Sequence, residues 1–491
     1  MRPNVAIIGA GFGGLCMAIQ LEKAGIRSYT VFEKGVDVGG TWRDNTYPGA
    51  GCDIPSHLYS FSFERYSSWT RRYPGQPEIL RYLEGCADKY GLRSRIRLNT
   101  MVVAAAFDES LGRWRVRTTA GDELFDVVVS AVGQLNRPHL PNIPGMSSFN
   151  GAAFHSARWN HSVDLAGRRV AVIGNGSSAA QLIPKVAEVA GHLDVFQRTP
   201  NWVIPKPDAV FGPRARMAFR HVPFLQRAYR EWVYRYAENT LYPALAGGWS
   251  TDLLRKRALG HLREQVPDPL LRAKLTPGYP VGCRRVVIDS GFYPALTRPN
   301  VDVVTDGITR IVPGGVETTA GLREADVIVY ATGFDTSDFL APMQVTGRGG
   351  RQLAEEWKGG AEAYLGIAVP HFPNLFLLYG PNTNLGHNSI VFMIECQVRY
   401  IMGCLPYLAS RGPMEVRPEA MATWRRSLDR AMEGMVWQAG CTSWYKNAAG
   451  RLTNNWPGTT TTYRRITRAP RPEAFHFARR TAATGPVTGN R

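Results

Sequence analysis

Two glycine-rich segments of the same form carry the clearest chemical signal in this sequence. The first, Gly-Ala-Gly-Phe-Gly-Gly at residues 9–14, follows an apolar run that predicts a strand at 5–8 and precedes a pattern that predicts a helix. In this setting the spacing Gly-x-Gly-x-x-Gly leaves free backbone amides and the positive end of a helix facing a phosphate group. We therefore expect the pyrophosphate of a dinucleotide to bind at Gly9, Gly11 and Gly14.

The same arrangement recurs at residues 174–179, where the segment reads Gly-Asn-Gly-Ser-Ser-Ala after an expected strand at 170–173. Alanine replaces the third glycine, whose role in packing the helix on the strand accepts a small side chain. A single motif of this kind is a weak signal, because glycine-rich turns are common in ordinary loops, but two copies in matching context are strong. We expect a second nucleotide at Gly174, Gly176, Ser177 and Ser178.

The residue after the second strand of each unit distinguishes the two nucleotides. Glu33 lies 24 residues after Gly9 (33 − 9), and Arg198 lies 24 residues after Gly174 (198 − 174). A carboxylate at this position accepts hydrogen bonds from a ribose diol, whereas an arginine neutralises a 2′-phosphate. The second unit therefore predicts NADPH rather than NADH, with Thr199 as a neighbouring contact.

A third repeat joins the two units, since residues 126–133 (Asp-Val-Val-Val-Ser-Ala-Val-Gly) resemble residues 326–333 (Asp-Val-Ile-Val-Tyr-Ala-Thr-Gly). Both predict buried strands that return the chain from one domain to the other, although two unrelated core strands would show the same periodicity. Between 206 and 283, aromatic residues and leucines at helical spacings predict a helical insertion that covers a cleft, its aromatic side chains packed inside. The expected fold is α/β, with two dinucleotide-binding (Rossmann-like) domains and a helical insertion.

Composition excludes several classes of protein. The chain has 491 residues, 44% hydrophobic and 20% charged, which is typical of a globular protein with two or three domains. No apolar stretch is long enough to span a bilayer, and the first strand runs into glycines rather than a cleavage site, so we expect a cytoplasmic location. The net charge of +18 allows a nucleic-acid partner, but a basic tail and two polyanionic cofactors explain it better.

The seven cysteines show no Cys-x-x-Cys pair and no metal-ligand spacing. We therefore expect no metal site and a reducing compartment. The same spacing weighs against a disulfide reductase, which needs two neighbouring cysteines beside its flavin.

Between the two glycine motifs lies Phe149-x-Gly151-x-x-x-His155-x-x-x-Trp159. With this segment the sequence resembles the class B flavoprotein monooxygenases, and among them the type I Baeyer–Villiger monooxygenases, from residue 5 to about residue 468. The resemblance implies FAD at the first unit, NADPH at the second, and a structural role for His155. Trp159 favours ketone oxidation over oxidation of sulfur or nitrogen, although Asn160 stands where the family usually has proline or aspartate.

The resemblance places the chemistry on Arg285 and Asp53. It implies that NADPH reduces FAD, that the reduced flavin forms a C4a-peroxyflavin with O2, and that a small organic ketone becomes an ester or lactone, with sulfides as further substrates. Such a reaction needs a fixed cation, because negative charge develops on oxygen. Arg285 would supply this charge and Asp53 would orient it, although on residue type alone Asp53 could cap a turn and Arg285 could be one of many surface arginines.

Further cofactor contacts follow from the resemblance in three loops. These are Gly40, Thr41, Trp42 and Asp53 at the flavin, Arg198, Thr199 and Arg284 at the 2′-phosphate, and Trp444 at the nicotinamide ribose. Arg284 stands where the family usually has lysine, which keeps the charge but changes a point donor into a planar fork.

The implied domains are interleaved along the chain. They are an FAD-binding domain (1–140 and 339–468), an NADPH-binding domain (141–205 and 284–338), the helical insertion (206–283) and a disordered basic tail (469–491).

Three alternatives stay open at this stage. One is a monooxygenase specific for sulfur or nitrogen, and another is a flavoprotein NADPH oxidoreductase that transfers no oxygen, which the segment at 149–159 disfavours. A nucleic-acid-binding protein is supported by net charge alone.

Overall fold

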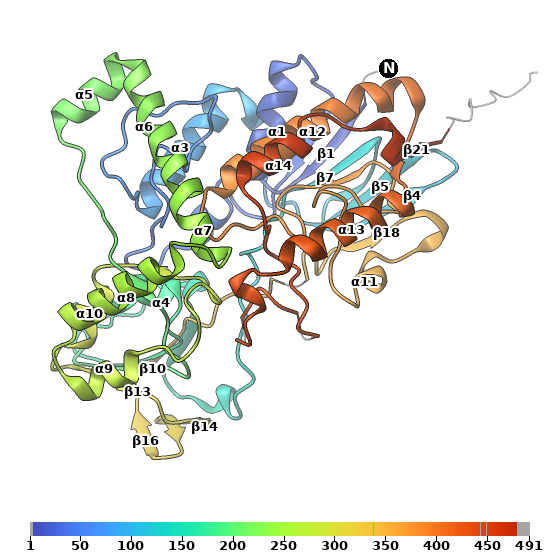
Figure 1. The fold of residues 1–491 in the computed structure, drawn as a ribbon. Helices are drawn as coiled ribbons and strands as arrows, with labels where there is room; N and C mark the ends of the chain where they lie inside the picture. The colour runs from blue at the N-terminus through green and yellow to red at the C-terminus, as the bar shows by residue number, and fades with distance from the viewer. Residues whose placement is uncertain (1–2, 337, 442, 448, 479–491) are drawn as a thin grey trace, which may run out of the picture.

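Two five-stranded parallel sheets organise the chain (Figure 1). The computed structural model describes residues 3–478 except 337, 442 and 448. In the order of the strands, the first sheet contains β19 (Leu375–Leu377), β7 (Val127–Ser130), β1 (Val5–Ile8), β2 (Tyr29–Phe32) and β3 (Ile96–Arg97). The second contains β13 (Val301–Val304), β10 (His192–Phe196), β9 (Arg169–Ile173), β17 (Val327–Tyr330) and β8 (Ala152–His155). Their central strands are continuous apolar runs because both faces are covered.

The repeated segments have one structural cause. β1 pairs with β7, with Val5 opposite Val127, and β9 pairs with β17, with Val170 opposite Val327. Gly9 has a φ of +104°, and an added Cβ would lie 2.7 Å from the Ala131 carbonyl oxygen. Gly174 has a φ of +115°, and its added Cβ would lie 2.4 Å from the Ala331 carbonyl oxygen. Each turn therefore needs glycine because the neighbouring strand passes so close.

Helices cover the sheets and form separate cores. α1 (Phe12–Lys23), α3 (Gln76–Lys89) and α12 (Ile390–Arg411) contribute to the core of the first sheet. α4 (Ser177–Val189) and α10 (Phe292–Leu296) contribute to the core of the second. α1 and α4 each begin directly after the second glycine of their motif, so the free amides of the helix start are presented at the turn.

Smaller sheets complete the two halves. One consists of β18 (Gln344–Thr346), β4 (Val102–Asp108), β5 (Arg113–Thr118) and β6 (Gly121–Phe125), and another of β14 (Ile308–Val312), β15 (Gly315–Thr318) and β16 (Gly321–Glu324). A further helix, α13 (Pro418–Met432), precedes the last described segments. The boundary positions expected for the domains stay predictions.

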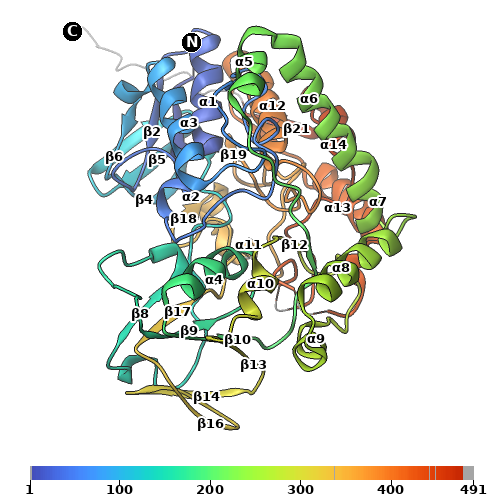
Figure 2. The ribbon, with the colours of Figure 1, turned by 90° about the vertical axis from the view of Figure 1, so that its left-hand side faces the viewer.

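The insertion is helical, as expected, and runs along one side of the molecule (Figure 2). Its elements are α5 (Pro213–His221), α6 (Pro223–Tyr236), a π-helical turn (Ala237–Leu241), α7 (Tyr242–Leu245), α8 (Thr251–Gln265) and α9 (Pro269–Leu275). The expectation that its aromatic residues pack inside is wrong for Phe224 and Trp232, which are 72% and 57% exposed. Helical periodicity indicates which residues share a face, but it does not say whether another element covers that face.

Two further expectations need correction. Residues 469–478 are ordered rather than disordered, because β21 (Phe475–Phe477) pairs with β20 (Met414–Val416) and buries Phe475; residues 479–491 lie outside the described chain. Cys283 and Cys441 form a disulfide although 158 residues separate them, so the cysteine spacing does not support a reducing compartment. No helix among the described residues has the length and hydropathy of a transmembrane span.

Candidate active site

A cavity of about 1160 Å³ gathers most of the predicted site residues. Those that line it are Thr41, Trp42, Asp53, Gly174, Gly176, Ser177, Ser178, Arg198, Thr199, Arg284, Arg285 and Trp444. We expected the helical insertion to cover a cleft. However, none of the described residues from 206–283 lines this cavity. Gly9, Gly11, Gly14, Glu33 and Gly40 belong to the first glycine turn and its surroundings instead, where an added Cβ on Gly11 would lie 3.7 Å from the Gly40 Cα.

Arg285 and Asp53 form an ion pair that faces this cavity. Arg285 Nη2 donates to Asp53 Oδ2 at 2.6 Å, and the two side chains are 28% and 18% exposed. Burial alone would raise the pKa of Asp53, but the charge and hydrogen bond of Arg285 hold it below its ordinary value. The Asp53 charge in turn raises the pKa of Arg285. Both groups are therefore ionised, and one face of the cavity carries a fixed guanidinium.

Two tyrosines that the sequence did not indicate lie near this pair, the buried Tyr445 and the partly buried Tyr379. Burial raises the pKa of Tyr445 to about 12, with the Arg285 charge acting in the opposite direction. Burial also raises the pKa of Tyr379, again opposed by Arg285. Tyr379 has a φ of +59° and its hydroxyl donates to Asn384 Oδ1 at 2.7 Å. Tyr445 adjoins the predicted Trp444, but no local pattern distinguishes Tyr379 from a core tyrosine.

The C-terminal segment with Trp444 is attached to the loop that follows β17. The Trp444 carbonyl oxygen accepts hydrogen bonds from Thr336 Oγ1 at 3.1 Å and from Asn454 Nδ2 at 2.8 Å. The Trp444 ring lies 4.5 Å from the Tyr445 ring, measured between centroids. Trp444 is thereby held at the cavity that Arg285 also faces.

The loop after β10 is held by amide side chains. Asn175, inside the second glycine motif, donates from Nδ2 to Gln197 Oε1 at 2.9 Å and to the Thr199 carbonyl at 2.8 Å. Asn201 Nδ2 donates to the Asn175 carbonyl at 2.9 Å. These bonds hold the residues on both sides of Arg198, whose own side chain is exposed.

Tyr279 joins Arg284 to the same loop. The Arg284 guanidinium lies 4.9 Å from the centroid of the Tyr279 ring, and the Tyr279 hydroxyl donates to the Pro200 carbonyl at 3.0 Å. Cation–π contact of this kind restrains a guanidinium without using its hydrogen-bond donors. The structure thus brings together the predicted Arg198, Thr199 and Arg284 and adds Tyr279 as a support that sequence reasoning missed.

Replacing Arg198 with alanine is expected to raise the KM for NADPH by about tenfold or more, because a charge-assisted contact is worth about 1.5–3 kcal/mol. NADH has no 2′-phosphate, so its KM should change little. Steady-state oxidation of the two nucleotides measures both values on one preparation. Equal damage to NADPH and NADH would mean that Arg198 supports the fold rather than the phosphate.

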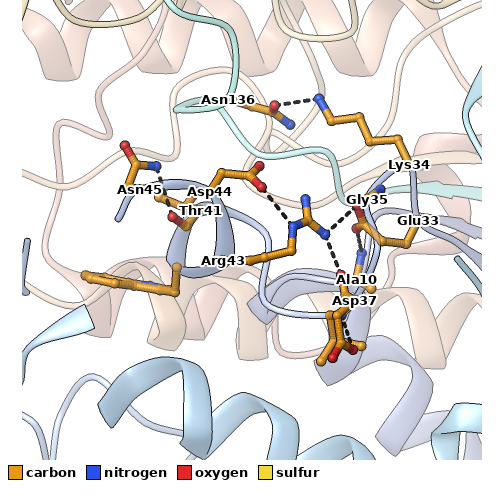
Figure 3. Close-up of polar contacts among 12 residues, drawn as sticks. Ala10, Glu33, Lys34, Gly35, Asp37, Thr41, Arg43, Asp44, Asn45 and Asn136 are labelled. Carbon is orange, nitrogen blue, oxygen red and sulfur yellow. Dashed lines mark hydrogen bonds and ion pairs between the residues drawn. The ribbon is translucent and has the colours of Figure 1, made fainter. Parts of the chain in front are cut away.

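The first nucleotide site is organised around Glu33 (Figure 3). The buried Glu33 carboxylate accepts hydrogen bonds from the Ala10 and Gly35 amides, each at 2.8 Å. Arg43 Nη1 donates to the same carboxylate at 2.8 Å, and Arg43 Nε donates to Asp44 Oδ1 at 2.8 Å. The orientation of Glu33 is therefore set by three donors, and Arg43 is another residue that the sequence analysis missed.

Alanine at Arg43 is expected to weaken retention of the flavin by about fivefold to tenfold, since the charge-assisted bond that orients Glu33 is lost. Fluorescence of free flavin after dilution and filtration measures this loss. Arg93→Ala is the matched control, because Arg93 forms an ion pair with Asp37 but is 39% exposed and does not touch Glu33. Equal flavin retention in the two variants would contradict a role for Arg43.

The motif at 149–159 is explained by contacts between β8 and the linker after β17. His155, at the end of β8, lies opposite Tyr330, and its ring centroid lies 5.9 Å from that of Phe334. An added Cβ on Gly151 would lie 2.2 Å from the Asp326 carbonyl oxygen, so only glycine fits. His155 is buried and its Nδ1 accepts from the Ala157 amide at 3.0 Å. These contacts support the structural role expected for His155.

One group of possible metal ligands does occur among the described residues. Ligand atoms of His192, Asp194 and Asp302 lie within 4.8 Å of one another. However, Arg323 Nη1 lies 3.1 Å from Asp302 Oδ2 and 3.5 Å from Asp194 Oδ1. The guanidinium already pairs with both carboxylates, and we assign no metal to them.

The residues present fit two dinucleotides. In both glycine turns the backbone amides at the start of the helix are free to bind a pyrophosphate. The first glycine of each turn cannot be replaced, because a side chain there would collide with the neighbouring strand. An added Cβ on Gly14 would lie 1.8 Å from the Gly9 carbonyl oxygen, so the third glycine of the first motif serves the packing of helix on turn. An added Cβ on Gly176 meets nothing within 4 Å, so the second turn is open to its ligand.

Fold and site together define a flavin-binding monooxygenase with two dinucleotide domains, and comparison with known proteins agrees. Residues 2–228 match the family described as flavin-binding monooxygenase-like. The chain is 44% identical over 475 residues to a Baeyer–Villiger monooxygenase of Streptomyces coelicolor. The alignment covers 95% of this chain and 91% of that protein. This chain belongs to the Baeyer–Villiger monooxygenases, as its motifs predicted.

Solved structures confirm the predicted fold class. A steroid monooxygenase bound to NADP aligns with a TM-score of 0.84 and 32% identity, over 95% of this chain and 97% of that one. OTEMO in complex with FAD and NADP aligns with a TM-score of 0.86 and 28% identity, over 97% of this chain and 100% of that one.

Proposed function

We propose that this enzyme uses FAD and NADPH to insert one oxygen atom of O2 into a small organic ketone, giving an ester or lactone, with Arg285 and Asp53 at the reacting centre. The observation that carries this proposal is the Arg285–Asp53 ion pair, which faces a cavity that the second glycine motif also lines. When bound, the flavin accepts hydride from NADPH and activates O2. The protein has to position the cofactors and stabilise the charge that develops.

Arg285 provides a cation that stays charged at any working pH, and it is already oriented before substrate arrives. Asp53 fixes the guanidinium through Nη2, and the Leu385 carbonyl accepts from Nη1 at 3.4 Å. A preorganised donor of this kind stabilises an oxyanion without reorienting during the reaction. We assign the developing negative charge on the ketone oxygen to this guanidinium.

The cofactor contacts form two sets. For FAD they are Gly9, Gly11, Gly14, Glu33, Gly40, Thr41, Trp42 and Asp53, and for NADPH they are Gly174, Gly176, Ser177, Ser178, Arg198, Thr199, Arg284 and Trp444. The exposed guanidinium of Arg198 and the Tyr279-supported guanidinium of Arg284 would together meet the 2′-phosphate.

The purified protein should be yellow and carry FAD, and it should oxidise NADPH faster when an accepted ketone is present. NADPH consumption and product mass are measured over cyclic, linear and aromatic ketones and over sulfides. Esters or lactones heavier than the ketone by one oxygen atom are the expected products. Sulfoxides alone would make the enzyme a heteroatom monooxygenase, and peroxide without oxygenated product would make it an NADPH oxidase.

A further inference from the structure

Helix α6 presents a row of aromatic side chains to solvent. Phe224, Trp232 and Tyr236 are 72%, 57% and 43% exposed. Trp232 stacks on Tyr236 with ring centroids 6.2 Å apart, and on Tyr229 with centroids 6.0 Å apart. Contiguous apolar surface of this kind on a folded protein marks a binding site.

The row follows one side of the helix. Phe224, Ala228, Trp232 and Tyr236 are all exposed and recur every four residues, so each lies next to the one before it and the row turns around the helix by about 40° per step. The other side of α6 is attached to the protein, where Gln226 is buried and Arg230 donates to the Ser60 carbonyl at 3.0 Å. Met217 of the adjoining α5 is a further exposed apolar residue, at 62%.

The charge around this face is mostly positive. Residues 213–236 contain six arginines and a single acid, Glu231, which pairs with Arg235 at 2.7 Å. Arg214, Arg220 and Arg227 are exposed. We propose that α5 and α6 bind the surface of an anionic phospholipid bilayer, with the aromatic row at the headgroup boundary and the arginines on the lipid phosphates.

Two other occupants fit less well. In a symmetric dimer the same patch meets itself, which would bring the arginines of both copies together in a chain of net charge +18. Single-stranded nucleic acid stacks its bases on free aromatic faces, but Trp232 is already stacked with two tyrosine rings, at interplanar angles of 25° and 24°. A bilayer needs no free ring faces and complements both the apolar and the charged groups.

The position of α6 relates this surface to the cavity. The helix continues into the π-helical turn, where the buried Glu238 accepts from Asn388 Nδ2 at 2.7 Å, and Asn388 lines the cavity. An apolar ketone concentrates in a bilayer, so an enzyme at its surface would meet more substrate. Membrane binding itself does not depend on the proposed reaction, and each can fail without the other.

The test is flotation of the FAD-loaded enzyme with vesicles of phosphatidylcholine alone and of equal parts phosphatidylcholine and phosphatidylglycerol. We expect binding to the anionic vesicles only, weakened by salt. The double variant Phe224→Ser/Trp232→Ser should lower the partition coefficient about tenfold or more. Arg220→Glu/Arg227→Glu should lower it by at least about tenfold, since each arginine near an anionic surface contributes about fivefold.

Matched controls are Leu322→Ser, at an apolar residue on β16 that is 52% exposed, and Arg168→Glu before β9. Both should float like the unchanged enzyme, and all variants should keep their flavin. Absence of binding to anionic vesicles, or undiminished binding by Phe224→Ser/Trp232→Ser, would overturn the proposal. So would a dimer in light scattering that this double variant dissociates, or binding of single-stranded DNA that displaces the vesicles.

Discussion

Replacing Arg285 with alanine is expected to reduce the rate of ester or lactone formation by about a hundred- to a thousand-fold, the usual effect of removing one preorganised donor from an oxyanion site. FAD should stay bound, because its proposed contacts in the first glycine turn are untouched. NADPH should still reduce the flavin, with peroxide released in place of product. Rapid-mixing absorbance, peroxide assay and product mass separate these steps.

Two substitutions make this result specific. Arg285→Lys keeps the charge but loses the planar fork that Asp53 orients, so it should restore only part of the rate. Arg284→Ala removes the neighbouring guanidinium, which rests on Tyr279 rather than on Asp53, and should raise the KM for NADPH while product still forms. Product formation by Arg285→Ala at nearly the unchanged rate would show that Arg285 is not catalytic.

Gly9→Ala is expected to abolish FAD binding, and Gly174→Ala is expected to abolish NADPH binding. Each position combines a positive φ with a neighbouring carbonyl oxygen, at 2.7 Å and 2.4 Å from an added Cβ. Those contacts are backbone atoms of β-strand ends and cannot move aside, so the turn must distort. Gly9→Ala should be purified colourless, whereas Gly174→Ala should be yellow and reducible by dithionite but not by NADPH.

The measurements are the flavin absorbance per chain and the rate of anaerobic reduction by each reductant. Gly85→Ala is the control, because Gly85 lies within α3 and an added Cβ meets nothing within 4 Å. It should behave like the unchanged enzyme. Flavin retained by Gly9→Ala, or NADPH reduction unimpaired in Gly174→Ala, would contradict the assignment of the two turns.

The sequence by itself determined the local units that dinucleotide binding requires. The glycine turns, the strands before them and the acid or arginine that follows each second strand all depend on backbone sterics and side-chain type over about thirty residues, a range in which spacing is readable. The repeat at 126–133 and 326–333 was readable for the same reason. The reason for the repeat is that the carbonyl oxygen at the end of each of these strands lies against Gly9 or Gly174, and only the three-dimensional structure shows this contact.

Tertiary structure decided which distant residues meet. Asp53 and Arg285 are 232 residues apart, and Tyr279 donates to a carbonyl 79 residues away, so neither contact leaves a periodic trace in the chain. The disulfide between Cys283 and Cys441 and the strand pairing of residues 475–477 were missed on the same ground. Burial is likewise a property of the neighbours, and for that reason Phe224 and Trp232 of α6 were expected inside but lie on the surface.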